Sequence, residues 1–279
     1  MNTLIIGGAG FIGSHLCSYY ISTGNHVVSL DNYISGSTCN HIDGVEYLNM
    51  DAIDINKIQN NFDLIFHLGE YSRVENSLKK VDFVLHNNLD PTLKILDFCR
   101  KNDSKLIYAG SSTKFADNGT NKYKSPYAFS KWKNSELIKF YCETYDIKYA
   151  IVYFYNVYGE RENSDGEFAT VIAKFLKLAK EGKVLEVTSP GTQRRNFTYI
   201  DDTINALALV AENGIGDEYG IANKKSFSII EVAQLISDNV TLTEENEANR
   251  LNSEIIIDKT IQLGWEAKHS LEDYIIKNK

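Results

Sequence analysis

A tyrosine and a lysine four residues apart are the first residues of this sequence whose types and spacing suggest joint chemistry. Tyr127 and Lys131 lie in the stretch SPYAFSK, directly after a Ser-Pro pair that is typical of a helix start. On a helix, residues four apart share one face, with Cβ atoms roughly 5–6 Å apart. A free phenol has a pKa of about 10 and is a poor base at neutral pH, but a neighbouring ammonium favours the phenolate. The pair therefore suggests a tyrosine base, although a half-buried tyrosine beside a surface lysine has the same spacing.

A glycine-rich stretch near the N-terminus predicts a dinucleotide site. Gly7, Gly10 and Gly13 in GGAGFIG follow an apolar run and precede a helical pattern. A turn without Cβ atoms lets a pyrophosphate approach the helix N-terminus, where free N–H groups favour anions. Asp31 ends the next apolar run, and a carboxylate there accepts hydrogen bonds from a ribose 2′-OH and repels a 2′-phosphate. This favours NAD over NADP. Asp51 is a candidate for the adenine amino group, with an ordinary loop carboxylate as the alternative.

The elements that must position these residues alternate along the chain. Apolar runs such as HVVSLDN, DLIFHLG and KLIYAGSS read as strands, and helical patterns between them extend over 81–101 and 126–145. Apolar strands alternating with helices predict an α/β fold with a doubly wound parallel sheet covered on both faces. We expect residues 1–165 to form the NAD-binding domain, with segments near 197–223 returning to it. Residues 166–279, where the alternation is less regular, are expected to form mainly a smaller substrate lobe.

Composition and charge exclude several classes of partner. The net charge of −8 and the pI near 5.3 argue against a nucleic-acid or anionic-membrane partner. No apolar run approaches the ~20 residues that cross a bilayer, and the first residues run directly into the glycine motif, which leaves no room for a targeting peptide. The four cysteines are scattered without the spacing of metal ligands. The sequence therefore predicts a soluble cytoplasmic protein without a metal.

Taken together, these features resemble the extended short-chain dehydrogenase/reductases that modify nucleotide sugars, the group that contains UDP-galactose 4-epimerase and the sugar-nucleotide dehydratases. Besides the glycine and tyrosine-lysine motifs, the resemblance is carried by HLGEYSRVENS, NNLDPT, YAGSSTKFA, YFYNVYG, RRNFTYIDD and LGW. It implies a Rossmann sheet with a small C-terminal lobe, NAD as cofactor and a nucleotide sugar in the cleft between them. It also implies a homodimer formed by the helices at 81–101 and 126–145, whose apolar faces could equally serve an internal core.

The resemblance assigns roles residue by residue. Ser111, with Ser112 as the alternative, would join Tyr127 and Lys131 in catalysis, and Asn88 would lie beside the nicotinamide. The implied cofactor-binding residues are Gly7, Gly10, Phe11, Ile12, Gly13, Asp31, Asn32, Asp51, Ala52, Leu68, Asn88, Tyr127 and Lys131. The implied substrate-binding residues are Ser112, Asn156, Arg195, Arg250, Glu70 and Arg73. For the diphosphate, a planar arginine fork such as that of Arg195 is well suited. Glu70 and Arg73 replace residues usual in the family, so they either face an unusual sugar or form a buried ion pair.

Departures from the family pattern narrow the reaction. Dehydratases carry an Asp-Glu pair after the active-site hydroxyl, where this chain has Ser112-Thr113, which disfavours dehydration. The segment ERENSDGE lacks the lysine that serves as second base in a heptose epimerase. The resemblance thus implies oxidation at C4 of a nucleotide sugar, by a 4-epimerase or a 4-dehydrogenase, for surface-polysaccharide sugars and conceivably a GDP-heptose. The alternatives are a 4-ketoreductase and a non-catalytic NAD-binding protein.

Overall fold

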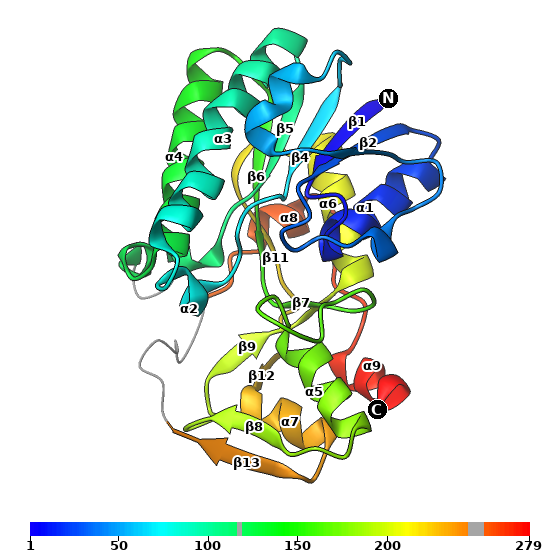
Figure 1. Cartoon of the computed structure of the whole chain (residues 1–279), viewed down its shortest axis with the longest axis vertical. Coiled ribbons are helices and arrows are strands. Elements are labelled where there is room, and N and C mark those ends of the chain that lie inside the picture. The colour runs from blue at the N-terminus through cyan, green and yellow to red at the C-terminus, as the bar shows by residue number, and fades with distance from the viewer. Residues whose placement is uncertain (116–118, 245–253) are drawn as a thin grey trace.

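The computed structural model describes residues 1–115, 119–244 and 254–279, and a parallel sheet forms the centre of this part of the chain (Figure 1). Its seven strands follow the order β11-β6-β5-β4-β1-β2-β3, and every neighbouring pair is parallel. The predicted doubly wound parallel sheet is therefore confirmed. The strands are β1 (Asn2–Ile6), β2 (His26–Asp31), β3 (Glu46–Asn49), β4 (Leu64–His67), β5 (Lys105–Ala109), β6 (Tyr149–Phe154) and β11 (Gly216–Ile221).

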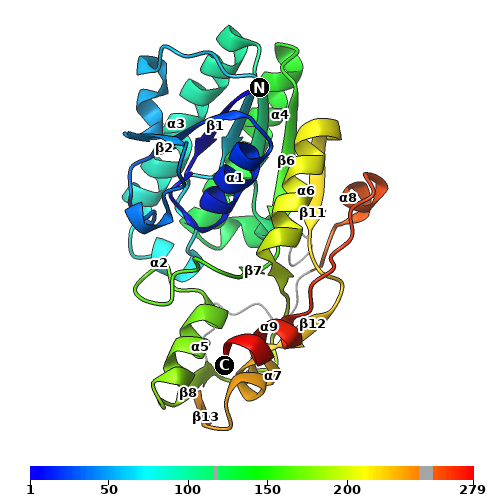
Figure 2. The same ribbon diagram turned by 90° about the vertical axis from the view of Figure 1, so that its right-hand side faces the viewer.

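Helices cover both faces of the sheet, which is why its central strands are apolar throughout. Along β1, Leu4 and Ile6 pack in the core on one face, which includes residues of α3 (Val81–Asn102) and α4 (Pro126–Thr144). Ile5 points to the opposite face and packs with residues of α1 (Phe11–Ser22) and α6 (Ile200–Asn213). Figure 2 shows α1 and α6 in front of the sheet, with α3 and α4 behind it. The helices predicted over 81–101 and 126–145 thus correspond to α3 and α4.

A smaller lobe lies beneath the sheet in Figure 1 and has its own core around Phe175, Leu185 and Val232. Its strand pairs are β8 with β13, which is parallel, and β9 with β12, which is antiparallel. The short parallel pair β7–β10 lies between the lobe and the sheet. The remaining elements are α2 (Val74–Ser77), β7 (Val157–Tyr158), α5 (Val171–Lys180), β8 (Leu185–Thr188), β9 (Arg194–Asn196), β10 (Thr198–Tyr199), β12 (Ser226–Ser228), α7 (Ile229–Ile236), β13 (Val240–Thr243), α8 (Asp258–Gln262) and α9 (Leu271–Asn278). Short 3-10 helices occupy Thr38–Asn40, Ala52–Lys57, Ser112–Phe115 and Asn121–Tyr123.

The chain order of these elements interleaves the two parts. After the lobe begins with α5, the chain returns to the sheet to form α6 and β11, and then crosses to the lobe again for β12 and α7. Because all strands of the sheet run in one direction, their carboxyl ends meet at the edge that faces the lobe (Figure 1). In open α/β sheets this edge is where ligands bind. Among the described residues, no helix has the length and apolar character needed to cross a bilayer.

Candidate active site

A cavity of about 450 Å³ runs along the carboxyl edge of the sheet, and it brings together most of the residues that the sequence singled out. Three segments share its wall: the glycine turn after β1, the start of α4, and the segment between β7 and α5. The predicted residues that line it are Gly7, Gly10, Phe11, Ile12, Gly13, Asp31, Asn32, Ala52, Leu68, Glu70, Arg73, Ser111, Ser112, Tyr127, Lys131 and Asn156. Asp51, Asn88 and Arg195 are not in this wall, and Arg250 lies outside the described residues.

Two glycines of the turn between β1 and α1 and of the first turn of the helix have no room for a side chain. Gly7 has a φ of +88°, and its N–H donates to Leu30 O at 2.8 Å. A Cβ on Gly7 would lie 2.8 Å from Gly69 Cα, and one on Gly13 would lie 2.0 Å from Gly7 O. Gly10 caps α1 without a side-chain hydrogen bond, so no side chain of the cap occupies the first N–H groups of the helix. This cradle fits the pyrophosphate of a dinucleotide.

Asp31 stands at the end of β2, where it can meet the ribose of such a dinucleotide. The residue is 7% exposed; its Oδ2 accepts from Ala9 N at 2.9 Å, and its Oδ1 from Tyr33 N at 2.8 Å. Burial raises the pKa of Asp31, and these two hydrogen bonds oppose that effect. Each carboxylate oxygen has a further lone pair that a ribose hydroxyl can use. Asp51, the residue predicted to meet the adenine amino group, instead caps a 3-10 helix by accepting from Ile53 N at 3.2 Å. It also accepts a hydrogen bond from the Asn32 side chain.

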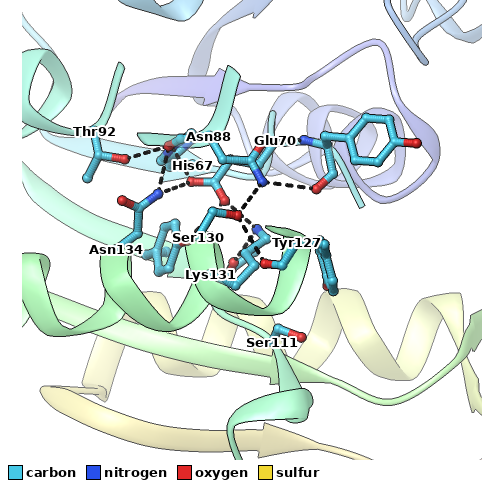
Figure 3. Close-up of polar contacts among 12 residues, drawn as sticks. His67, Glu70, Asn88, Thr92, Ser111, Tyr127, Ser130, Lys131 and Asn134 are labelled. Carbon is cyan, nitrogen blue, oxygen red and sulfur yellow. Dashed lines mark hydrogen bonds and ion pairs between the residues drawn. The ribbon is translucent and has the colours of Figure 1, made fainter. Parts of the chain in front are cut away.

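The tyrosine-lysine pair is placed by the start of α4. Ser125 caps this helix by accepting from Ala128 N at 3.1 Å, and Pro126 is its first residue, as the Ser-Pro pair predicted. Tyr127 and Lys131 then lie one turn apart and both line the cavity (Figure 3). Among the described residues no partner bonds to the Tyr127 hydroxyl, which leaves it available to a substrate. Lys131 Nζ donates to Ala109 O at 2.8 Å.

Ser111 follows the end of β5 on the same side of the cavity as α4. It is 6% exposed, its Oγ lies 2.8 Å from Thr113 Oγ1, and it accepts from Thr113 N at 3.3 Å. Ser112 also lines the cavity, as the alternative hydroxyl. A Cβ on Gly110, just before them, would lie 2.6 Å from the Tyr153 ring, so the strand end is packed tightly. A hydroxyl held there can donate to an oxygen that is becoming a ketone.

The Glu70 side chain does not face the cavity. It forms a buried ion pair, but its partner is Lys131 and not Arg73. Its Oε2 lies 2.8 Å from Lys131 Nζ, and its side chain is 0% exposed (Figure 3). Glu70 therefore contributes only its main chain to the cavity wall. Asn88 is enclosed as well: its amide accepts from Tyr71 N at 2.8 Å and donates to Tyr71 O and to Ser130 Oγ. In α3 it is the preceding residue, Asn87, that lines the cavity.

Arg73 joins the loop after β4 to the segment before α5. Its guanidinium donates to Phe168 O and lies over the Phe168 ring at 5.9 Å, while its Nε is buried without a partner among the described residues. Asn156 has a φ of +40° and donates to Asn196 O at 2.9 Å at the other end of the cavity wall. Arg195 lies on β9, where it donates to Arg194 O at 2.8 Å. Because Arg195 is outside the cavity wall, its contact with a diphosphate stays a prediction.

Glu162 is a cavity residue that the sequence reasoning missed. Its Oε2 accepts from Gly159 N at 2.9 Å, whereas its Oε1 is buried without a hydrogen-bond partner among the described residues. Burial raises the pKa of Glu162 to about 7. Glu162 lies in the segment ERENSDGE, which follows the YFYNVYG motif. The sequence suggested a role for this segment only through its lack of a lysine, and not through its glutamates. No cluster of potential metal ligands occurs in the part of the chain that the structure describes.

Comparisons with known proteins agree with this arrangement. The model of the NAD dependent epimerase/dehydratase family matches residues 3–222. A UDP-N-acetyl-alpha-D-glucosaminuronate decarboxylase of Bacillus cytotoxicus is 31% identical, over 83% of this chain and 78% of its own. A putative UDP-glucose 4-epimerase of Methanocaldococcus jannaschii is 30% identical, over 98% of this chain and 95% of its own. The solved UDP-glucose 4-epimerase of Thermotoga maritima, with UDP-glucose, has a TM-score of 0.93 over 100% of this chain and 97% of its own; at 24% identity this shows the fold alone.

The chain is therefore an enzyme of the NAD dependent epimerase/dehydratase family. The predicted resemblance to this group is confirmed, and the family's cofactor agrees with the prediction of NAD from the glycine turn and Asp31.

Proposed function

We propose that this chain oxidises C4 of a nucleotide-activated sugar, as a 4-epimerase or a 4-dehydrogenase. The observation that carries the proposal is that Tyr127, Lys131 and Ser111 line the same cavity as the glycine cradle. A sugar bound between them would have its hydroxyl beside a base and its ring carbon beside a nicotinamide. NAD, when bound, supplies the hydride acceptor, and the protein supplies position and proton transfer.

The side chains divide this work between them. Tyr127, as phenolate, takes the proton of the sugar hydroxyl while the attached carbon loses its hydride. Ser111 donates to the same oxygen as it becomes a ketone, and Lys131 holds the ribose with its remaining N–H. Ser112 and Thr113 cannot act as the acid and base that remove water, which disfavours a dehydratase. A 4-epimerase returns the hydride to the other face of the ketone, whereas a 4-dehydrogenase releases the ketone.

Further parts of the proposal concern the nucleotide and the biological role. We propose that the lobe formed mainly by residues 166–279 holds the nucleotide, with Asn156 and Arg195 toward its diphosphate. The 30% identity to a putative UDP-glucose 4-epimerase supports C4 chemistry. A role in surface-polysaccharide synthesis and a GDP-heptose substrate stay predictions from the motifs, as does a cytoplasmic location. The 4-ketoreductase is the second candidate, because the same three side chains also serve the reverse reaction.

A homodimer through α3 and α4 is part of the proposal. One face of these helices packs on the sheet, yet Leu93 and Phe140 on them are 52% and 66% exposed. Large exposed apolar side chains on two neighbouring helices are a feature of protein interfaces. Analytical ultracentrifugation of the wild type and of Phe140→Glu tests this, with a dimer expected only for the wild type.

The reaction is tested with the wild type and with Tyr127→Phe. We incubate each with UDP-, GDP-, CDP- and dTDP-sugars deuterated at C4 and follow the label and the absorbance of reduced nicotinamide. Wild type should move deuterium to the cofactor with one nucleotide class, and Tyr127→Phe should retain cofactor but lose this transfer. Deuterium returned to the sugar in the inverted isomer identifies an epimerase, and accumulated ketone a dehydrogenase. Transfer by Tyr127→Phe at the wild-type rate would contradict the mechanism.

A further inference from the structure

Arg73 is a cavity residue whose guanidinium has N–H donors to spare. An arginine carries five such donors, and the described residues offer an acceptor only to Nη2, which donates to Phe168 O. Nε is buried without a hydrogen-bond partner, and no carboxylate of the described residues lies within 4 Å of the guanidinium. A buried donor without an acceptor is unfavourable and uncommon in folded proteins. Arg73 is therefore suited to an acceptor that the protein itself does not provide.

The carboxyl groups near Arg73 do not balance its charge. Glu167 and Glu162 both interact with Arg73 electrostatically, but Glu167 is already paired with Lys80 at 2.6 Å. Glu162 lines the cavity from the segment after β7, and burial raises its pKa to about 7, so a large share of it is protonated near neutral pH. Burial also lowers the pKa of Arg73, as expected for a cation without a close anion. Arg73 therefore leaves a positive charge in the cavity wall.

The guanidinium of Arg73 is held in place by an aromatic ring and by main chain. It lies over the Phe168 ring at 5.9 Å, and this ring packs edge-on against Tyr71, with centroids 5.6 Å apart. The contact of Nη2 with Phe168 O fixes the guanidinium a second time. A planar guanidinium can offer two parallel N–H donors to the two oxygens of a carboxylate, which a lysine cannot do. Arg73 is thus preorganised for a planar anion.

The segment that carries Arg73 packs against the start of α4. Arg73 directly precedes α2, and Ser77, the last residue of α2, accepts from Tyr127 N at 3.4 Å. Figure 1 shows α2 on the side of α3 and α4 that faces the smaller lobe. Arg73 and Tyr127 both line the cavity, and of the ionisable side chains described near Arg73, Tyr127 interacts with it most strongly. An anion held by Arg73 would therefore lie at the end of the cavity where a sugar hydroxyl meets Tyr127.

Building on the proposed function, we propose that Arg73 selects a nucleotide-activated uronic acid by pairing with the C6 carboxylate of its sugar. In a uronic acid C6 is bonded to C5, the neighbour of the carbon whose hydroxyl would meet Tyr127. A sugar with its C4 hydroxyl at Tyr127 therefore brings this carboxylate to the wall that carries Arg73. A neutral hexose or heptose would leave the charge of Arg73 without a partner. Arg73 is a specificity-determining residue in this account and takes no part in hydride or proton transfer.

The test measures binding without turnover. The full-length enzyme carrying Tyr127→Phe and saturated with NAD⁺ is titrated by calorimetry with UDP-glucuronate, UDP-glucose and UDP, and in parallel with GDP-mannuronate, GDP-mannose and GDP. In one of the two series the uronate should bind about tenfold more tightly than the neutral sugar, because a charged hydrogen-bonded pair forms. In Arg73→Gln on the same background this ratio should fall to about one. The dissociation constants of the bare nucleoside diphosphate and of NAD⁺ should not change.

Two variants separate recognition of a carboxylate from other roles of Arg73. Arg73→Lys keeps the charge but not the planar fork, so it should retain a preference of only about threefold, and it serves as the test if Arg73→Gln does not fold. Arg161→Gln removes an exposed positive charge outside the cavity wall, where Arg161 donates to Ser14 and Ser18 on α1, and should keep the full preference.

Three results would overturn the proposal. The first is the absence of any preference for the uronate in both series before Arg73 is changed. The second is an equal loss of affinity for uronate, neutral sugar and bare diphosphate in Arg73→Gln, which would make Arg73 a diphosphate contact. The third is a loss of NAD⁺ affinity in that variant, which would make it a cofactor contact. Since no oxidation is measured, these results do not depend on whether C4 is the carbon that is oxidised.

Discussion

The Glu167 carboxylate lies 2.6 Å from the Lys80 ammonium and thereby ties the segment before α5 to the residue that precedes α3. The same carboxylate accepts from the Tyr71 hydroxyl, and the nearby Arg73 guanidinium donates to Phe168 O. These three contacts join the two sides of the cavity wall. They hold together the loop after β4 and the segment that carries Glu162, on either side of the place proposed for the sugar.

Removing this tie should weaken substrate binding more than it weakens the fold. In Glu167→Ala we expect KM for the sugar nucleotide to rise about fivefold with kcat little changed, because the Lys80–Glu167 pair is partly exposed and worth about 1 kcal/mol. Steady-state kinetics and thermal unfolding measure the two effects. Glu181→Ala is the matched control, since it breaks a surface pair with Lys183 of similar length, 2.7 Å, outside the cavity wall. Equal KM values for the two variants would show that the tie does not shape the site.

Gly13→Ala should abolish cofactor binding. The new Cβ would lie 2.0 Å from Gly7 O, so the turn must move away from the position that its backbone now holds. We expect the dissociation constant for NAD to rise at least a hundredfold in isothermal titration calorimetry, with some loss of stability. Gly24→Asn is the control: Gly24 has a φ of +79°, which Asn tolerates, and a Cβ there meets nothing within 4 Å. Retained NAD affinity in folded Gly13→Ala would contradict this account of the cradle.

Glu162 should make the stability of the protein fall as the pH rises toward neutrality. Its pKa in the folded chain, about 7, is above the ordinary value of 4.5, so between these values the unfolded chain ionises first and gains relative to the folded one. Below about 4.5 both states are protonated, and above about 7 both are ionised. The expected loss across this window is about 3 kcal/mol, since each pKa unit corresponds to about 1.4 kcal/mol. Urea unfolding of Glu162→Gln should lack this slope, whereas Glu186→Gln on an exposed position of β8 should retain it. Parallel curves for wild type and Glu162→Gln would be the opposing result.

The sequence predicted the parts of the site that depend on local patterns. The sheet, the glycine turn and the start of α4 follow from strand and helix periodicity and from Ser-Pro at 125–126, and Tyr127 and Lys131 share a helix face by spacing alone. Partners contributed by distant elements were beyond such reasoning. Whether Glu70 meets Lys131 depends on how far the loop after β4 enters the core. Likewise, the rotation of α3 about its axis buries Asn88 and directs Asn87 toward the cavity. The path of the segment after β7 places Glu162 in the cavity wall.

The position of β11, the edge strand beside β6, has a consequence for folding during synthesis. β11 and the covering helix α6 are synthesised only after α5 and β8 of the smaller lobe. Until residue 200 has been synthesised, β6 is therefore an unpaired edge strand of the sheet. The apolar face of the sheet around Ile5 and Val152 is then not yet covered by α6. The domain that contains the central sheet therefore cannot fold completely from the N-terminal part of the chain alone. It is completed only when α6 and β11, which follow the first elements of the smaller lobe in the sequence, have been synthesised.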